Sequence, residues 1–385
     1  AGETPSDNST GYRCAERWTT HRPPAQPSRV SAGPYYNAPM DTVRVGIIGF
    51  GRIGADHAKW LAEANGARAT AVADATPARQ ELARSRGLTA YVTPAQMLAE
   101  GSIDAVLVST PTAMHFEHAS QALAAGKHVM VEKPMALDLA QARALCDQAD
   151  ERGRVLTVFH NRRWDADYLT VRDAVASGAL GKLINIESRL GQFISCVGPA
   201  AKEYRPNWRN EAPFGGGGLY DWGSHFLDQL WRLLRPARPL RVFAQLRGNV
   251  WSTDCDDFAR ILIDFDNGVA AQVDINTTTT SPLPRWRLDG TNGSASSPHS
   301  PSYDSETWAD LRFVPANANP YTVPRAAPGL TETQIWQTFA QSIRGQGPPA
   351  VTARSVLMTM ALLDAARESS RTGRAVEITE PLPNE

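Results

Sequence analysis

A glycine-rich turn after a short apolar run is the first feature of the sequence that could do chemistry. The run Val43–Ile48 leads into Gly49-Phe-Gly51-Arg-Ile-Gly54, and a helix is predicted from near Ile53. In this spacing the first glycine permits a tight turn, the second lets the backbone approach a pyrophosphate, and the third lets helix and strand pack closely. The alternative is a glycine-rich turn without a ligand. The predicted dinucleotide-binding loop comprises Gly49, Phe50, Gly51, Arg52, Ile53 and Gly54.

Asp74 supports this prediction and bears on the choice of cofactor. It ends the next predicted strand, twenty residues after Gly54, where a carboxylate can accept both ribose hydroxyls of a dinucleotide. The same carboxylate would repel the 2′-phosphate of NADP, which favours NAD. Because Arg52 and Arg79 are near enough in sequence to offset that repulsion, we expect NAD and keep NADP as the alternative.

Glu132-Lys133-Pro134 directly follows the predicted strand His128–Val131. Ligands of doubly wound folds bind beyond the carboxyl ends of the strands, so this segment is expected beside the cofactor. Oxidation of an alcohol by a nicotinamide needs a base for the hydroxyl proton and a positive group for the developing alkoxide. Lys133 is therefore a candidate proton donor or oxyanion partner, and a surface lysine is the alternative.

A second candidate group follows the glycine run at 215–218. Asp221 and His225 are four residues apart in a predicted helix, which places them on one face. A carboxylate one turn before an imidazole can fix its tautomer and stabilise the imidazolium formed after proton abstraction. We predict that His225 is the base and Asp221 its orienting partner. A structural Asp–His pair in a packed helix is the alternative, and Asp228 is expected to be structural.

The other histidines carry weaker signals. His115 and His118 come soon after the predicted strand Ala105–Val108, and they either line the nicotinamide side or pack beneath it. His57 is expected to pack or to lie at the surface. Because no second cluster of cysteine, histidine or carboxylate residues has the spacing of metal ligands, we predict no catalytic metal.

Short apolar runs alternate with helical stretches in the first half of the chain. Continuous apolar strands are typical of a parallel sheet that is buried on both faces. Helices are predicted at residues 114–125 and 137–152, and such alternation indicates an α/β domain with a doubly wound Rossmann sheet. The predicted strands are Val43–Ile48, Thr70–Ala73, Ala105–Val108, His128–Val131 and Leu156–Val158.

The pattern changes after about Phe159, where helices precede a mostly antiparallel sheet. Asp266-Asn-Gly268 lies between two extended runs and predicts a hairpin, and helices are expected again at 331–344 and 352–371. We place the dinucleotide-binding domain at residues 41–159 and an α+β domain for substrate and oligomerisation at 160–385. Residues 1–40, rich in Pro, Ser, Thr and Arg, are expected to form a disordered tail or an arm that embraces a neighbouring subunit. The predicted strands of the second domain are 183–187, 240–246, 258–265 and 270–275.

The composition excludes several classes of protein. With 385 residues and a formal net charge of -1, the chain has no basic excess that would neutralise the phosphates of a nucleic acid. Its apolar runs are shorter than the ~20 residues that span a bilayer, so no membrane partner is expected. The 4 cysteines form no C-x-x-C pair, which fits a reducing, cytoplasmic setting.

Taken together, these blocks resemble the Gfo/Idh/MocA family of glucose-fructose oxidoreductase, inositol dehydrogenase and rhizopine-catabolism enzymes. The likeness covers about residues 43–372 and is closest in pattern to the scyllo-inositol dehydrogenase branch, although Trp222 stands where that branch usually has leucine. It implies an open antiparallel sheet in the second domain that forms homodimers or homotetramers. It rests on the glycine loop, Ser109-Thr-Pro-Thr-x-x-His115, the block Ala125–Pro134, and the D-x-x-x-H pattern of Asp221 and His225.

The resemblance implies residue roles, with Lys133, Asp221 and His225 as the catalytic group. The implied activity is hydride transfer between NAD(P) and a small sugar or cyclitol. An NAD-retaining glycosidase and a non-catalytic NAD-sensing regulator are the alternatives. Besides the glycine loop and Asp74, the cofactor is expected to contact Thr110, Pro111, His115, Glu132, Lys133, Asn161, Trp208 and Arg209. The substrate is expected to contact Lys133, His160, Arg163, Asp221 and His225.

Overall fold

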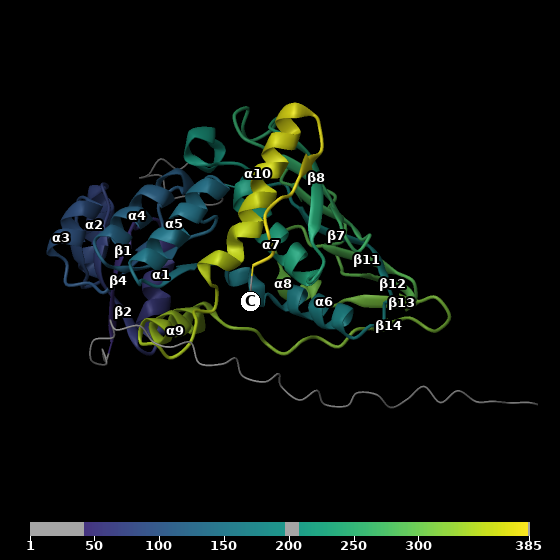
Figure 1. Cartoon of the computed structure of the whole chain (residues 1–385), viewed down its shortest axis with the longest axis horizontal. Coiled ribbons are helices and arrows are strands. Elements are labelled where there is room, and N and C mark those ends of the chain that lie inside the picture. The colour runs from purple at the N-terminus through teal and green to yellow at the C-terminus, as the bar shows by residue number, and fades with distance from the viewer. Residues whose placement is uncertain (1–41, 197–207, 384–385) are drawn as a thin grey trace, which may run out of the picture. The chain divides into compact units, whose positions relative to one another are not determined.

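The computed structural model describes residues 42–196 and 208–383 of the chain (Figure 1). Along the chain, a parallel sheet of six strands precedes a mixed sheet of nine. The predicted tail, residues 1–40, lies outside the described residues. The strands of the first sheet are β1 Val43–Ile48, β2 Ala67–Ala73, β3 Thr89–Tyr91, β4 Ala105–Val108, β5 His128–Val131 and β6 Leu156–Val158.

The first sheet has the strand order of a Rossmann fold, β3-β2-β1-β4-β5-β6, and its neighbouring strands are parallel. The predicted doubly wound sheet is confirmed. The sequence did not reveal β3, because this strand has only 3 residues, none fully buried, and so shows no apolar run. The strand order reverses between β1 and β4, and the crevice beyond their carboxyl ends is where such folds bind ligands.

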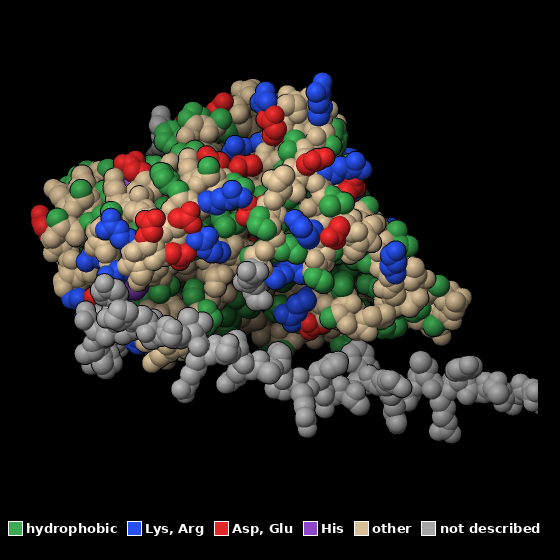
Figure 2. Space-filling model, in the orientation of Figure 1, with side chains coloured by type: hydrophobic (Ala, Val, Ile, Leu, Met, Phe, Trp, Pro, Cys, Tyr) green, Lys and Arg blue, Asp and Glu red, His purple; other side chains and the backbone are tan. Residues whose placement is uncertain are grey.

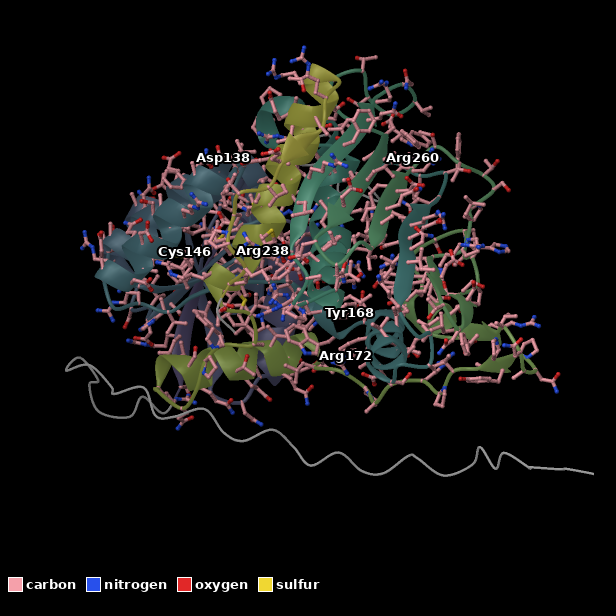
Figure 3. All side chains as sticks on the ribbon, turned by 45° about the vertical axis from the view of Figure 1, so that its right-hand side comes forward. Asp138, Cys146, Tyr168, Arg172, Arg238 and Arg260 are labelled. Carbon is pink, nitrogen blue, oxygen red and sulfur yellow. The ribbon has the colours of Figure 1, made fainter. Side chains whose placement is uncertain are left out.

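In residues 42–196, five helices accompany the first sheet. Asp138 shows how one of them begins, because its side chain accepts a hydrogen bond of 2.8 Å from the backbone N–H of Gln141. This cap satisfies a free amide of the first turn, and the helix therefore starts just after Asp138 (Figure 3). Cys146 lies on the buried side of the same helix. The helices are α1 Arg52–Glu63, α2 Pro77–Ser85, α3 Pro94–Glu100, α4 His115–Ala124 and α5 Leu139–Glu151.

Helix α9 (Glu332–Ile343) returns to the first sheet from the far end of the chain. It packs against α1 and β2 (Figure 1). Its buried side chains Ile335, Trp336 and Phe339 belong to the same apolar cluster as the β1 residues. No local pattern predicts this contact, because the apolar stripe of a helix does not indicate which surface it will cover.

The second sheet has the order β14-β13-β12-β11-β7-β10-β9-β8-β15. Its neighbours are antiparallel except for β7 and β10, which run parallel. Gly268 has a φ of 84° in the turn between β9 and β10, as the predicted hairpin requires. The strands are β7 Leu183–Gly191, β8 Pro239–Arg247, β9 Phe258–Phe265, β10 Ala270–Asn276, β11 Trp286–Gly290, β12 Gly293–Ser296, β13 Arg312–Pro315, β14 Tyr321–Thr322 and β15 Val376–Glu377.

Helices cover one face of this second sheet. Along β9 the side chains alternate, with Ile261 and Ile263 buried toward the helices and Arg260 and Leu262 exposed on the other face, as expected for an antiparallel sheet that is packed on one side. Arg260 can be seen beside the strands in Figure 3. The helices of this part are α6 Ala166–Ala176, α7 Ser224–Leu233, α8 Ser305–Trp308 and α10 Leu357–Thr372.

The surface and the helices show two general features. On the face seen in Figure 2, lysine and arginine side chains are interspersed with aspartate and glutamate, so that no large field of one sign covers it. Among the described residues, no helix combines the length and apolar character needed to cross a bilayer.

A buried ion pair joins the segment after β6 to α7 and α10. The Arg163 guanidinium donates to both carboxylate oxygens of Asp228, at 2.7 and 2.8 Å, and Thr359 donates to the same carboxylate at 2.9 Å. Burial opposes ionisation of Asp228, but Arg163 and His160 outweigh it and hold the pKa of that carboxyl well below its usual value. The expected structural role of Asp228 agrees with this position.

Asp228→Ala is expected to lower the free energy of unfolding by about 3 to 5 kcal/mol, because it leaves the Arg163 charge buried without a partner. Asp173→Ala, at the exposed Arg172–Asp173 pair on α6 (Figure 3), is the control and should change it by less than ~1 kcal/mol. Urea unfolding at neutral pH measures both. Similar shifts in the two variants would contradict the structural weight given to the buried pair.

Candidate active site

A cavity of about 810 Å³ opens beyond the carboxyl ends of the parallel strands. The loops after β1, β2, β4, β5 and β6 line it, together with residues around α7. Most residues proposed from the sequence meet here although they are far apart in the chain. Those lining the cavity are Gly49, Gly51, Arg52, Ile53, Asp74, Thr110, Pro111, His115, Glu132, Lys133, Asn161, Trp208, Arg209, Asp221 and His225.

The glycine loop has the geometry of a dinucleotide cradle. A Cβ added at Gly54 would lie 2.2 Å from the carbonyl oxygen of Gly49, so the helix can approach the strand only without a side chain there. A Cβ at Gly51 would meet nothing within 4 Å, which leaves space at the start of α1 for a pyrophosphate. Phe50 is fully buried and, like Gly54, does not line the cavity. The loop therefore fits the predicted cofactor.

Asp74 holds the rim of this loop. Its two carboxylate oxygens accept the backbone N–H groups of Phe50 at 2.7 Å and of Thr76 at 2.8 Å. Each oxygen can accept a further hydrogen bond, so the carboxylate can still receive ribose hydroxyls. Arg52 and Arg79 also line the cavity. Both the group that favours NAD and the cations that could accommodate NADP are therefore present.

Lys133 and Asp221 form an ion pair across the cavity wall. The Lys133 Nζ donates to Asp221 Oδ1 at 2.9 Å and to its backbone oxygen at 2.7 Å. Arg209 Nε lies 3.5 Å from the same carboxylate oxygen. Burial opposes ionisation of Asp221, but Lys133 and Arg209 outweigh it and keep the pKa of the carboxyl below its usual value. The pair therefore presents a fixed ammonium group beside an ionised carboxylate.

Asp221 does not pair with His225, contrary to the orienting role expected from their spacing. Residues Leu219–Gly223 form a π-helical turn before α7, and because its hydrogen bonds run from i to i+5, each turn holds more residues and the offset between positions four apart changes. The Nδ1 atom of His225 is buried and has no hydrogen-bond partner among the described residues. Burial, reinforced by Lys133 and Arg162, lowers the pKa of His225 well below its usual value. The imidazole is therefore neutral and can accept a proton.

Two residues expected to contact substrate lie behind the cavity. Arg163 is committed to Asp228 and to Ser355, whose hydroxyl oxygen lies 2.9 Å from Nη1, and it does not line the cavity. His160 is also absent from the wall and packs edge-on against His225, with 5.7 Å between ring centroids. Instead, the adjacent Arg162 faces the cavity. In the 3-10 turn of Asn161–Trp164, successive side chains diverge by about 120°, which the sequence pattern cannot resolve.

His115 joins the two loops that carry cofactor-site residues. Its Nδ1 lies 2.8 Å from the carbonyl oxygen of Pro134, and its Nε2 lies 2.9 Å from that of Thr110. Burial lowers its pKa, and a neutral imidazole donates through only one nitrogen. His118 faces the Thr110 hydroxyl at 3.2 Å. Both histidines line the cavity edge, so the two expected roles, lining and packing, coincide in them.

A buried chain of hydrogen bonds from Trp336 through His57 holds the Glu132 side chain in place. Trp336 on α9 donates through its indole N–H to His57 Nδ1 at 3.0 Å. Because an indole can only donate, His57 carries its proton on Nε2, which donates to Glu132 Oε1 at 2.8 Å. Glu132 Oε2 accepts the backbone N–H of Lys133 at 3.1 Å. His57, expected merely to pack or to lie at the surface, thus fixes the segment that carries Lys133.

Residues 42–196 and 208–383 contain no recognisable metal-binding site. No group of three or more histidine, cysteine, aspartate or glutamate side chains in these ranges could hold a metal ion. Cys146, Cys196 and Cys255 are free thiols, and Cys14 lies outside the described residues.

Comparison with known proteins places this geometry in a family. Residues 43–160 match the oxidoreductase family with an NAD-binding Rossmann fold, GFO_IDH_MocA, and residues 168–296 match the GFO/IDH/MocA C-terminal domain. The chain belongs to the Gfo/Idh/MocA family. The predicted resemblance, oxidoreductase class and nicotinamide cofactor are thereby confirmed. The Asn161 position falls just outside the first match, and the α9 helix lies beyond the second.

Individual relatives support the same assignment. The chain is 27% identical over 363 residues to the scyllo-inositol 2-dehydrogenase (NADP(+)) IolW of Bacillus subtilis, covering 88% of this chain and 96% of that protein. It is 38% identical over 216 residues to the oxidoreductase YdgJ of Escherichia coli, covering 56% of this chain and 60% of that protein. An NAD-binding protein from Listeria innocua has a similar structure, with a TM-score of 0.78, 29% identity and coverage of 88% of this chain and 98% of that one.

The Trp336–His57–Glu132 chain predicts different effects for two replacements of His57. His57→Leu leaves Oε1 of Glu132 buried without its donor, and is expected to lower the unfolding free energy by ~1 to 3 kcal/mol more than His57→Gln, whose amide can still donate. Although burial raises the pKa of Glu132, His57 and Lys133 outweigh it and hold that pKa below its usual value. The advantage of glutamine should therefore be complete at neutral pH and fade as the pH falls below ~4.3.

Urea unfolding of both variants between pH 7 and pH 3 measures this effect. NADH fluorescence titration of the folded variants reports whether the cofactor site is kept, and we expect weaker binding for His57→Leu than for His57→Gln. Equal stability of the two variants at every pH would show that His57 acts only by filling space.

Proposed function

We propose that the protein is an NAD(P)-dependent dehydrogenase that transfers hydride between the nicotinamide and a CH–OH group of a sugar or cyclitol. The observation that carries this proposal is the meeting of a neutral His225 and the Lys133–Asp221 ion pair on the wall of a cavity that also contains a dinucleotide cradle. Relatives named scyllo-inositol 2-dehydrogenase and D-glucoside 3-dehydrogenase support the substrate class.

Each group of residues lining the cavity has a distinct role in the proposed reaction. The loop Gly49–Gly54 and Asp74 would hold the cofactor. Further contacts to it would come from the cavity-lining residues Thr110, Pro111, Asn161 and Trp208. The bound nicotinamide would accept or supply hydride. His225 takes the hydroxyl proton of the substrate, because its unprotonated nitrogen is free to accept it. Lys133 stabilises the substrate oxygen as charge develops on it. Asp221 holds Lys133 in place, instead of orienting His225.

The preferred cofactor is proposed to be NAD. Asp74 lies at the loop rim and its carboxylate would repel a 2′-phosphate, which supports NAD. Arg52 and Arg79 line the same cavity, and the Bacillus subtilis relative is named for NADP(+), so NADP is the alternative cofactor. The lean toward inositol-like polyols rests on the sequence pattern, from which Trp222 departs.

The function is tested by following NADH absorbance during a screen of inositols, aldoses and sugar acids with NAD and NADP. His225→Ala and Lys133→Ala are each expected to lower kcat by ~10² to 10⁴-fold, because each removes a group that acts in the transition state. His299→Ala is the matched control, since His299 is exposed and does not line the cavity.

Three outcomes would contradict parts of this proposal. Equal turnover by the wild type and His225→Ala would exclude His225 as the base. Faster turnover with NADP would overturn the argument from Asp74. Hydrolysis of a glycoside without net formation of NADH would replace the dehydrogenase with the glycosidase alternative.

We also propose that the outer face of the second sheet associates two or more copies of the chain. Phe243 on β8 and Leu262 on β9 are partners in the ladder and are 36% and 42% exposed on that face. Covering such a pair removes apolar surface from water. Light scattering should therefore give a mass of two or four times 41.8 kDa, and Leu262→Glu should lower it. A wild-type mass of one chain would contradict this proposal.

A further inference from the structure

Three side chains from distant segments form a corner of the cavity, which we call the Arg162 corner. It consists of Arg162 from the turn after β6, Trp222 from the turn before α7, and Tyr303 from the loop before α8, all of which line the cavity. The rings of Trp222 and Tyr303 stack, with centroids 5.4 Å apart and planes at 23°. The Arg162 guanidinium carbon lies 3.6 Å from the Tyr303 ring centroid and 5.0 Å from that of Trp222.

Neighbouring side chains hold the Arg162 guanidinium in place, and part of the Arg162 side chain remains exposed. Arg162 Nη1 lies 3.5 Å from Asp165 Oδ2, while the closer partner of that oxygen is the hydroxyl of Tyr303, which donates to it. Stacking on two rings and this ion pair fix the orientation of the guanidinium plane. The Arg162 side chain still keeps 21% of its surface exposed. The corner is therefore prepared before a substrate arrives.

The polar atoms that the corner leaves without partners are both hydrogen-bond donors. The Nε of Arg162 and the indole Nε1 of Trp222 are buried and have no partner among the described residues. Asp165, the carboxylate that contacts the corner, already receives Tyr303 and Arg162 and does not line the cavity, whereas Asp221, which does line it, is paired with Lys133. A buried donor without a partner is costly, so a ligand that supplies acceptors alone suits this wall better than a hydroxyl, which also brings a donor.

The positive charges near the reacting atoms also favour an anionic ligand. Lys133 and Arg162 both lower the pKa of His225, and Arg209 acts with them on Asp221. Burial raises the pKa of Asp165, while the Arg162 guanidinium 3.5 Å away opposes that shift. An oxidised nicotinamide would add a further positive charge. An anionic group on the substrate would thus be attracted to this end of the cavity.

We propose that the Arg162 corner binds a carboxylate of the substrate, and that the protein therefore acts on sugar acids, meaning polyhydroxy compounds that carry a carboxylate. This inference rests on the proposed dehydrogenase function and names the substrate class of the same site. A guanidinium matches the two oxygens of a carboxylate with two parallel N–H donors. With the carboxylate at Arg162 and Trp222, a hydroxyl carbon of the same molecule can lie between His225 and Lys133. Arg162 and Trp222 are in this proposal the residues that determine specificity.

Matched pairs of ligands test this proposal by binding alone. D-Glucuronate and D-galacturonate differ from D-glucose and D-galactose only in a carboxylate that replaces a CH₂OH group. Calorimetric titration of the methyl glycosides of these four sugars into the full-length protein saturated with NADH avoids turnover, because a hydroxyl cannot accept hydride from NADH and a glycoside has no open-chain aldehyde that could. The acid of each pair is expected to bind about tenfold more tightly or better, and the preference should shrink at high salt.

Variants locate the preference at the corner. Arg162→Gln is expected to reduce the acid-to-neutral ratio to about threefold or less, and Trp222→Phe, which removes one donor and keeps a ring, to reduce it partially. Arg172→Gln is the matched control, because Arg172 is exposed on α6 and pairs only with its neighbour Asp173 in the described contacts. It should keep the wild-type ratio. NADH titration confirms that each variant is folded, and Trp222→Phe keeps the test valid if Arg162→Gln is not.

The outcomes separate this inference from the proposed function. Neutral sugars that bind as well as their acids, or a preference that survives both Arg162→Gln and Trp222→Phe, would overturn the carboxylate site. Tighter binding of glucose 6-phosphate than of glucuronate would also overturn it, in favour of a phosphate. A clear preference for the acids without oxidation of any ligand by NAD would instead uphold the carboxylate site and refute the dehydrogenase.

Discussion

The ion pair between Lys133 and Asp221 holds together the two halves of the proposed site. Lys133 follows β5 at the edge of the parallel sheet, whereas Asp221 belongs to the π-helical turn that precedes α7 in the second part of the chain. Their contact of 2.9 Å fixes the ammonium group at the end of the cavity that also contains His225. A charge pair in such a place loses much of its hydration, so it is favourable only when geometry and further hydrogen bonds compensate. The backbone oxygen of Asp221 and the nearby Arg209 provide that compensation.

Buried carboxyl groups accept backbone N–H groups in the segments that carry Lys133 and Asp221. On the Lys133 side, Glu132 accepts from His57 and from the Lys133 backbone, and α9 closes the chain of hydrogen bonds through Trp336. On the Asp221 side, Asp256 accepts the backbone N–H of Leu219 at 2.7 Å through its side chain, at the start of the π-helical turn. Burial raises the pKa of Asp256 to about 7. Distant segments thus position a contact between two side chains, which is how a site gains precision from its surroundings.

Local patterns revealed the parts of this protein whose function depends on a few neighbouring residues. The glycine loop could be found because its conformation and its closeness to the helix require the absence of a Cβ, as the 2.2 Å approach at Gly54 shows. The position of Lys133 followed from the rule that parallel strands end at one edge. In contrast, the sequence predicts a site role for Arg163, whereas Arg162 lines the cavity, and the spacing of Asp221 and His225 predicts a pair that the structure does not contain. Tyr303 carried no signal at all, because it lies in a loop far along the chain.

Local sequence patterns predict the alternation of strands and helices, the nucleotide loop, and the set of reactive residues at the sheet edge, since these depend on backbone conformation and on periodic burial over short distances. The pairing of the side chains, in contrast, depends on how distant segments pack in the folded chain. Asp221 pairs with Lys133 and not with His225. Trp336 on α9 supports the segment that carries Lys133. Arg162 contacts Trp222 and Tyr303 at one corner of the cavity. The physical reason is that hydrogen bonds and ion pairs depend on distances of a few ångströms between segments that no local pattern relates.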